Sequence, residues 1–287
     1  MKRAIFLFLV LTIFSVATIN AQHFNYLANF EDLSKFTIID SAHLKCSYKL
    51  TYLKDSLDRD NKSSDRQVLL VGKNISKYYS QYALDYNHFV VEHLKTHETY
   101  QRTPNKGAWS YEVFKNYPQG KETVTDIAST LRKSFLYEDN LSIPQWQITN
   151  EKQKILSYDC QKATTTFRGR QYVAWFTTEI PIPNGPWKFG GLPGLILKIY
   201  DSKENFIFEC DGIELLKKKE PIKFYRIGYN KITRQNLNRV YQRFHDDRAA
   251  YLLTIGMPTM GRDPVTGEWV EVKSTKSKLP YNPIELK

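Results

Sequence analysis

Residues 175–201 read Trp-Phe-Thr-Thr-Glu-Ile-Pro-Ile-Pro-Asn-Gly-Pro-Trp-Lys-Phe-Gly-Gly-Leu-Pro-Gly-Leu-Ile-Leu-Lys-Ile-Tyr-Asp. Four glycines and four prolines lie between two apolar runs that are typical of β-strands. Glycine adopts backbone angles that a Cβ atom forbids, whereas proline fixes φ and removes a hydrogen-bond donor. The segment therefore predicts a tightly constrained loop that joins two strands. Its glycines and prolines are Gly185, Gly190, Gly191, Gly194, Pro181, Pro183, Pro186 and Pro193.

The segments around this loop alternate apolar and polar residues, as half-buried strands do. A turn at residues 168–170 joins two of them into a hairpin, and residues 202–205 join another two. Residues 55–66 are expected to be a polar connection and 105–120 a turn-rich segment. The expected strands cover residues 43–54, 67–72, 75–79, 154–167, 171–180, 195–201 and 206–213.

Two segments show helical rather than strand periodicity. Residues 81–100 contain no Pro or Gly, and their apolar residues suit a helix. Residues 233–244 place Leu237, Val240, Tyr241 and Phe244 on one face, with Thr233 as a cap. The tail from residue 257 is interrupted by Pro and Gly and predicts turns.

Many short-spaced strands and few helices predict a mainly β fold. We expect a curved antiparallel sheet, wrapped like a half-barrel and covered by one or two helices; a β-sandwich is the alternative. Hydrophobic residues make up 41% of the chain and aromatics 14%, enough for a substantial core. Residues 22–287 are expected to form one domain, whose C-terminal helix and tail begin at about residue 229.

The N-terminal residues 1–21 have the features of a secretory signal peptide. Lys2 and Arg3 precede an apolar core at residues 4–17, and Ala21 offers a small residue for cleavage. No second long apolar run predicts a transmembrane span. We therefore expect an exported protein, in the periplasm, on the outer-membrane surface or outside the cell.

The chain is basic, which bears on its partners. Its 41 Lys and Arg exceed its 30 Asp and Glu by 11, and removal of Lys2 and Arg3 leaves +9. Such a charge suits an anionic lipid or glycan surface, although dispersed lysines also simply keep a protein soluble. Export makes nucleic acid an unsuitable partner. The sequence does not indicate an oligomeric state.

Several ordered motifs resemble one known family. The hallmark is Gly191-Leu192-Pro193-Gly194-Leu195-Ile196, and residues 76–80, 155–163, 167–170, 175–181 and 282–286 also match. The sequence is similar in these elements to the GLPGLI family of exported Bacteroidota proteins. The resemblance implies export and a shared β-rich fold, and it implies no reaction, cofactor or catalytic residue.

The Gly/Pro segment is the first candidate for ligand binding. Trp175, Trp187 and Phe189 offer flat apolar surfaces for a sugar or a lipid chain, beside a lip formed by Gly191, Pro193 and Gly194. The alternative is that Trp175 belongs to the core and that the other two aromatics hold the loop against the sheet.

Three cysteines follow the signal peptide: Cys46, Cys160 and Cys210. Strand alternation puts Cys160 on the face of Tyr158, and Cys210 on the face of Phe206 and Phe208. If both faces point inward, a Cys160–Cys210 disulfide can form in an exported protein. The alternative is a buried free thiol, and a reactive Cys160 paired with a histidine is less favoured.

A histidine cluster is the weak candidate for metal binding. His93 and His97 lie one helical turn apart, and His88 and Glu92 precede them. The spacing from His88 to Glu92 and His93 is one residue longer than in the inverted zinc-protease motif His-x-x-Glu-His, and a third ligand is not identified. A polar helix face is the alternative.

No other motif predicts catalysis. The chain contains no Gly-x-Ser-x-Gly, and its glycines lack the Lys-Ser/Thr of a phosphate loop. Glu179 and Asp201 flank the Gly/Pro segment and could form an acid–base pair, or they could bind backbone N–H groups. No cofactor is expected.

The favoured function is therefore a non-enzymatic exported protein that binds an apolar ligand, a glycan or an envelope partner. A metal-dependent hydrolase that uses residues 88–97 and a purely structural envelope component are the alternatives.

Overall fold

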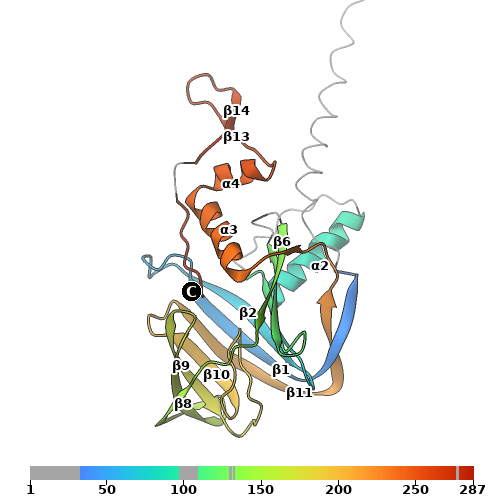
Figure 1. Ribbon diagram of the computed structural model, residues 1–287, viewed down its shortest axis with the longest axis vertical. Helices are drawn as coiled ribbons and strands as arrows, with labels where there is room; N and C mark the ends of the chain where they lie inside the picture. The colour runs from blue at the N-terminus through green and yellow to red at the C-terminus, as the bar shows by residue number, and fades with distance from the viewer. Residues whose placement is uncertain (1–32, 97–108, 129–130, 132, 276–277) are drawn as a thin grey trace, which may run out of the picture.

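The structure is a computed structural model that describes residues 33–287, apart from 97–108, 129–130, 132 and 276–277 (Figure 1). The predicted signal peptide and residues 22–32 lie outside the described residues. The strands are β1 Phe36–Leu53, β2 Lys62–Val71, β3 Ser76–Ser80, β4 Tyr111–Lys115, β5 Lys121–Ala128, β6 Lys133–Asn140, β7 Gln147–Ile155, β8 Tyr158–Phe167, β9 Arg170–Thr177, β10 Leu195–Asp201, β11 Phe206–Tyr225, β12 Asn230–Lys231, β13 Thr259–Arg262 and β14 Trp269–Val272.

One twelve-stranded sheet dominates the fold. Its order is β12-β6-β5-β4-β3-β2-β1-β11-β10-β9-β8-β7, and every neighbouring pair is antiparallel except β12 and β6. The order follows from a succession of hairpins, with one long return that places β11 beside β1. Because β7 and β12 lie at opposite ends of this order, the sheet is open rather than closed into a barrel.

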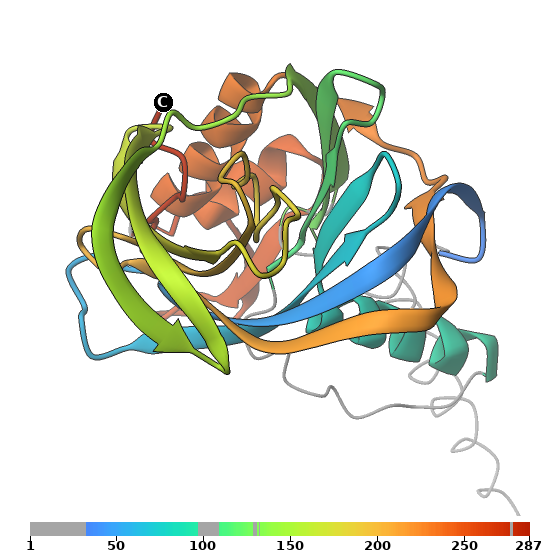
Figure 2. The same ribbon diagram turned by 90° about the horizontal axis from the view of Figure 1, so that it is seen from below.

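The two longest strands, β1 and β11, form the middle of the sheet. They pair from Phe36 with Tyr225 to Tyr52 with Phe206, and three irregularities interrupt the register. Bulges of this kind bend a strand and increase its twist, so they let long strands follow a curve. Figure 2 shows the resulting bowl, with β1 and β11 crossing its base. The prediction of a curved, half-barrel-like antiparallel sheet is confirmed.

Three helices lie in the described residues: α2 Gln81–Thr96, α3 Arg234–Asp246 and α4 Arg248–Thr254. The predicted helix at 233–244 is confirmed, and the Thr233 side chain caps it by accepting a hydrogen bond from Asn236 N. Helix α2 confirms the helical pattern found from residue 81. None of the described helices is long and apolar enough to span a membrane.

Four local predictions need correction. Residues 154–167 are not one strand, because Leu156 adopts φ of 54° in a turn that separates β7 from β8. The turn-rich segment 105–120 contains β4, and the polar connection 55–66 ends in the first residues of β2. The tail from residue 257 contains a small hairpin, β13–β14. The first residues of β2 are polar and mostly exposed, so they lack the apolar alternation by which strands are recognised, whereas β4 is a short buried strand within a turn-rich stretch.

The predicted hairpin after residue 154 is otherwise confirmed. Strands β8 and β9 pair from Gln161 with Phe176 to Phe167 with Arg170. The two turn residues, Arg168 and Gly169, have φ of 48° and 86°. Positive φ at both positions is the signature of a two-residue turn whose twist matches that of the strands.

A buried carboxyl group joins helix α3 to the sheet. Asp126 on β5 is fully buried and accepts hydrogen bonds from Tyr241 Oη at 2.5 Å and Ser110 Oγ at 2.6 Å. Burial raises the pKa of Asp126 to about 6, although both hydrogen bonds oppose the rise. The folded protein therefore holds this proton at pH values where the unfolded chain has lost it.

This pKa predicts how stability depends on pH. Because the folded pKa exceeds the unfolded value, the contribution of Asp126 to stability falls as pH rises from about 4 to about 6. Asp126→Asn keeps an acceptor for Tyr241 and has no charge to bury. We expect the variant to gain stability over the wild type between pH 4 and pH 7, reaching about 3 kcal/mol. Urea unfolding across this pH range measures the difference.

The control is Asp263→Asn, because backbone N–H groups of Thr266 and Val265 lower the pKa of Asp263. Removing the Asp263 carboxylate should lower the free energy of unfolding at neutral pH, and this loss should disappear in acid. The pH dependence of Asp263→Asn therefore has the opposite sign to that of Asp126→Asn. If the free energy of unfolding of wild type and of Asp126→Asn depended on pH in the same way, the raised pKa of Asp126 would be contradicted.

Candidate functional site

The Gly/Pro loop, residues 178–194, folds back into the bowl instead of projecting from it. Figure 2 shows this segment inside the curve of the sheet, between β9 and β10. Phe189 is fully buried, and its ring lies 4.7 Å from that of Tyr172 in an edge-on contact. Trp187 is 4% exposed and contacts Trp109, with ring centroids 5.4 Å apart. The loop thus supplies part of the core of the concave side.

Two glycines of the hallmark motif are required by geometry. A Cβ atom on Gly194 would lie 1.9 Å from the carbonyl oxygen of Thr177, so only glycine lets the loop approach the end of β9. Gly191 adopts φ of 85°, and a Cβ atom there would meet Ile143 at 2.2 Å. The motif therefore encodes a backbone path.

A lysine from the opposite wall of the bowl fixes this path. Lys115 on β4 donates hydrogen bonds from Nζ to Asn184 Oδ1 at 2.8 Å, Gly185 O at 2.7 Å and Phe189 O at 2.6 Å. Burial lowers the pKa of Lys115 to about 7, whereas three acceptors favour its protonated form. One ammonium group thereby satisfies three oxygens of the loop, in addition to the backbone hydrogen bonds that the loop forms within itself.

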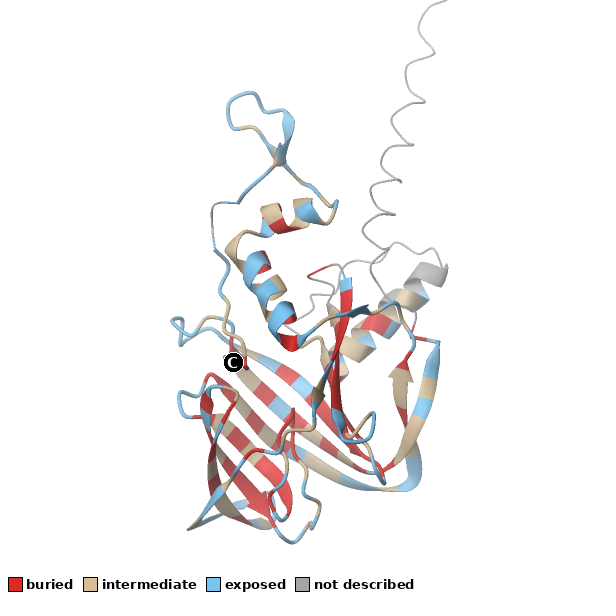
Figure 3. Ribbon diagram, in the orientation of Figure 1, coloured by how far each residue is buried: buried red, intermediate tan, exposed pale blue. Residues whose placement is uncertain are grey.

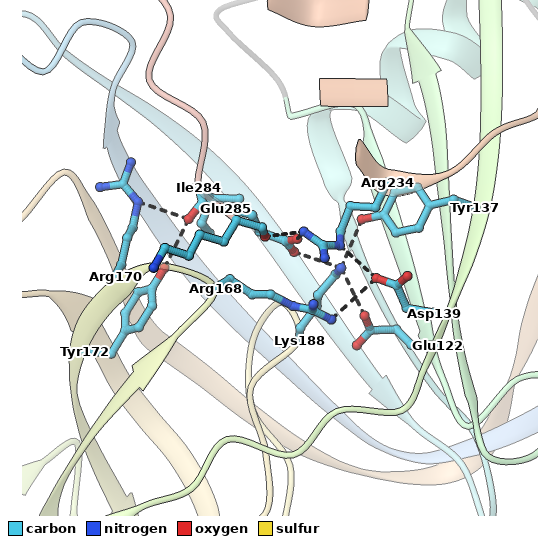
Figure 4. Close-up of polar contacts among 11 residues, drawn as sticks. Glu122, Tyr137, Asp139, Arg168, Arg170, Tyr172, Lys188, Arg234, Ile284 and Glu285 are labelled. Carbon is cyan, nitrogen blue, oxygen red and sulfur yellow. Dashed lines mark hydrogen bonds and ion pairs between the residues drawn. The ribbon is translucent and has the colours of Figure 1, made fainter. Parts of the chain in front are cut away.

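A second buried lysine belongs to the loop itself. Lys188 Nζ lies 3.0 Å from Glu122 of β5 and 2.8 Å from Glu285, and it donates to Tyr137 Oη at 3.0 Å (Figure 4). The Lys188 and Glu122 side chains are at most 1% exposed. Burial raises the pKa of Glu122, and the ion pair with Lys188 opposes this rise. The loop, the sheet and the closing residues of the chain therefore meet at one ammonium group.

Arginines extend this network toward the surface. Arg234 of α3 pairs with Asp139 at 2.9 Å and with Glu285 at 3.4 Å, and Arg168 also contacts Asp139. Three cationic side chains thus face three carboxylates, and the cluster is neutral (Figure 4). A balanced, mostly buried network of this kind fixes geometry and leaves no charge for a ligand.

The segment 282–286 is held by Arg170 of β9. Its guanidinium donates to Ile284 O at 3.0 Å, Pro283 O at 2.5 Å and Asn282 Oδ1 at 2.7 Å, and it pairs with Asp201. This explains why the Asn-Pro-Ile-Glu-Leu motif accompanies the Gly/Pro motif. Both segments bind to the β8–β9 hairpin and to each other.

The predicted aromatic lip is corrected by these contacts. Trp187 and Phe189 are buried in the core, so they do not offer an exposed surface to a ligand. Gly191 and Pro193 are exposed, and Gly194 is buried. The alternative interpretation, in which the loop aromatics hold the loop against the sheet, describes the structure.

Trp175 has a different position from the other two aromatics. Its strand neighbours Ala174 and Phe176 point into the bowl, so alternation places Trp175 on the convex face. There it lines a hollow of about 230 Å³ with Tyr200 and Ile207. Trp175 is only 9% exposed and belongs to the buried core, as its alternative interpretation predicted, whereas Tyr200 and Ile207 are partly exposed. We call this feature the outer hollow.

Charged side chains form the rim of the outer hollow. Lys198 lies directly across from Trp175 in the strand register, and its Nζ is 2.8 Å from Glu209. Both side chains are partly exposed, at 31% and 43%. Gln153 and Glu204 complete the lining. The arrangement provides an apolar floor between hydrogen-bond donors and acceptors.

The predicted carboxylate pair binds backbone groups. Glu179 Oε1 accepts from Asp159 N at 2.8 Å, and Asp201 Oδ1 accepts from Phe206 N at 2.8 Å. Asp201 is buried and also pairs with Arg170. The second interpretation of these residues is therefore the one that the structure supports.

The predicted disulfide is not formed. Cys46, Cys160 and Cys210 are buried free thiols. Strands β10 and β9 separate the strands that carry Cys210 and Cys160, whereas a disulfide requires Cα atoms within about 7 Å. Burial raises the pKa of Cys160 to about 11 and of Cys210 to about 12. Neither thiol is set up as a nucleophile.

The histidine cluster is only partly described. His88 is exposed on α2, whereas the side chain of His93 and all of His97 lie outside the described residues. Among the residues that the structure describes, no three His, Cys, Asp or Glu side chains are arranged to hold a metal ion. Metal binding there stays a prediction.

Sequence reasoning missed the buried cations Lys115, Lys188, Arg170 and Arg234. Lys188 carried one signal, because it stands between two large aromatics in a glycine-rich loop. Its carboxylate partners come from residues 122 and 285, and no local pattern connects them.

Comparisons with known proteins found one family model and several solved structures. The family "N-glycanase peptide, N-terminal domain" matches residues 120–234, which is less than half of the chain. Two crystal structures of PNGF-II are similar, with 13% and 14% identity and TM-scores of 0.43 and 0.41. The matches cover 70% and 77% of this chain but 32% and 35% of the PNGF-II chains, so this chain spans about a third of their length. No curated protein sequence matches.

The close approach at Gly194 predicts a specific loss of stability. Gly194→Ala should destabilise the protein by at least about 2 kcal/mol, because the methyl group overlaps a backbone oxygen and the loop must shift. Gly228→Ala is the matched control, since no atom lies within 4 Å of its added Cβ. Denaturant unfolding should separate the two variants, and equal effects would contradict the geometric requirement.

The Lys188 network predicts a larger effect. Lys188→Met leaves the buried Glu122 without its ion-pair partner and leaves Glu285 with only the 3.4 Å contact to Arg234, so it should cost about 3–5 kcal/mol. Lys198→Met breaks the partly exposed pair with Glu209 and should cost less than about 1 kcal/mol. Adding Glu122→Gln and Glu285→Gln to Lys188→Met should recover part of the loss, because the stranded charges are removed. Failure of that rescue would show that packing, and not charge, explains the effect.

Proposed function

We propose that this chain is an exported, non-enzymatic protein of GLPGLI type that binds glycans at the outer hollow. The observation that carries the proposal is the composition of that hollow. Trp175, Tyr200 and Ile207 form its floor, and Lys198 and Glu209 lie on its rim. On the concave side, the loop aromatics Trp187 and Phe189 are buried as part of the core.

The chemistry of a sugar suits such a surface. One face of a pyranose ring presents C–H groups that pack on aromatic rings, while its hydroxyls need donors and acceptors around the edge. The Lys198–Glu209 pair supplies a donor and an acceptor, and Gln153 supplies both. A purely apolar ligand would make no use of these rim groups.

The family match supports a glycan rather than another polar ligand. The matched residues 120–234 include the strands that carry Trp175, Tyr200 and Ile207. The matched description concerns an N-glycanase, which suggests N-linked glycans as the first ligands to test. The reaction itself is not proposed for this chain, because it spans about a third of PNGF-II and the part of the chain that the structure describes shows no catalytic constellation.

A titration with N-linked glycan tests the proposal. A glycopeptide that carries an N-glycan should bind and should change the fluorescence of Trp175. Tyr200→Ala should weaken binding about tenfold, because a stacking surface is lost from a partly exposed position. Trp175→Ala should abolish binding, and thermal unfolding must show that this variant is folded.

Trp269→Ala is the matched control, since Trp269 is 64% exposed on β14, away from the hollow. It should bind like the wild type. The proposal fails if Tyr200→Ala binds as well as Trp269→Ala, or if the peptide without its glycan binds equally.

A further inference from the structure

Strand β11 contains a protruding segment that the pairing with β1 does not accommodate. Ala42 pairs with Glu220 and Leu44 pairs with Leu215, so the single residue His43 faces four residues of β11. These four are Leu216, Lys217, Lys218 and Lys219. An insertion of this size must leave the plane of the sheet. We call residues 215–219 the lysine bulge.

The lysine bulge is exposed and yet anchored. Lys217, Lys218 and Lys219 are all exposed, and Leu215 is 76% exposed. Leu216, in contrast, packs against a small second core that includes Ala42 and Ile222. Figure 3 shows β11 exposed where the two long strands bend. The packing of Leu216 therefore fixes the segment, while the Leu215 side chain and the three lysines are exposed to solvent.

The nearby acidic groups do not neutralise this charge. Glu220 is already paired with Lys45 at 3.1 Å. Glu214 is exposed beside Leu215, which leaves the bulge an excess of positive charge. None of the three lysines forms an ion pair among the residues that the structure describes. Three ammonium groups so close together repel each other unless an anionic surface faces them.

We infer that the lysine bulge is a docking surface for an anionic lipid bilayer. Lysines beside an anionic membrane surface each contribute to binding, and an adjacent exposed aliphatic side chain enters the interface. The three lysines would contact the lipid phosphates, and Leu215 would insert between the headgroups. This surface is separate from the outer hollow, whose lining ends at Glu209 on the same strand.

Leu215 distinguishes a membrane from a soluble polyanion. An anionic polysaccharide would bind the lysines alone and would gain nothing from a leucine in water. With a bilayer, both the lysines and Leu215 contribute to binding, because the aliphatic side chain leaves water when it enters the interface. The combination of exposed Leu215 with the lysines therefore favours lipid.

Cosedimentation of the mature chain with vesicles tests this inference. The protein should bind phosphatidylcholine vesicles that contain phosphatidylglycerol, should not bind pure phosphatidylcholine, and should be released by salt. Replacing Lys217, Lys218 and Lys219 with Gln should weaken binding roughly 100-fold. Leu215→Ser should weaken it about tenfold.

The control replaces Lys62, Lys152 and Lys203 with Gln, which removes the same charge from exposed sites elsewhere. The affinity of this control variant for the vesicles should lie within a factor of about three of the wild-type affinity. Equal losses in the two triple variants would overturn the inference, because they would show binding by overall charge alone. An unchanged Leu215→Ser, or binding to heparin but not to the vesicles, would overturn it in favour of a soluble polyanion.

These outcomes are independent of glycan binding. The triple variant of the bulge should bind the N-glycopeptide normally, and Tyr200→Ala should bind vesicles normally.

Discussion

Two buried lysines hold the Gly/Pro loop inside the curved sheet, and the rest of the architecture depends on them. Lys115 reaches from β4 to three oxygens of the loop, and Lys188 reaches from the loop to Glu122 and Glu285. Without Lys115, the carbonyl oxygens of Gly185 and Phe189 would be buried without this donor, which is costly in a core. The lysines therefore allow a loop to take the place that a further layer of secondary structure occupies in other folds.

This arrangement decides where ligands can bind. The concave side is filled by the loop aromatics and by a neutral charge network, whereas the convex face keeps aromatic and charged groups at the surface. The lysine bulge lies on strand β11, and the outer hollow shares Ile207 and Glu209 with that strand while most of its other lining comes from β7, β9 and β10. The fold thus separates the residues that hold the bowl together from those available to partners.

The site residues show which features of the site local sequence patterns can predict and which they cannot. All three aromatics lie in or beside the Gly/Pro segment, yet Trp187 and Phe189 pack in the core of the concave side, whereas Trp175 lines the outer hollow because its strand position places it on the convex face. Cys160 and Cys210 each lie on a buried face as expected, but two intervening strands keep them apart. Strand alternation specifies a face, whereas contact across a sheet depends on strand order.

The local elements could be predicted because their causes are local. The Arg168–Gly169 turn, the Thr233 cap and the strands around the Gly/Pro loop each follow from residues a few positions apart. The polar network could not be predicted, since its partners are far apart in the chain, as Lys188 and Glu285 are. Whether a lysine is solvated or buried depends on which carboxylate the folded sheet brings to it. That pairing was decided by the tertiary structure alone.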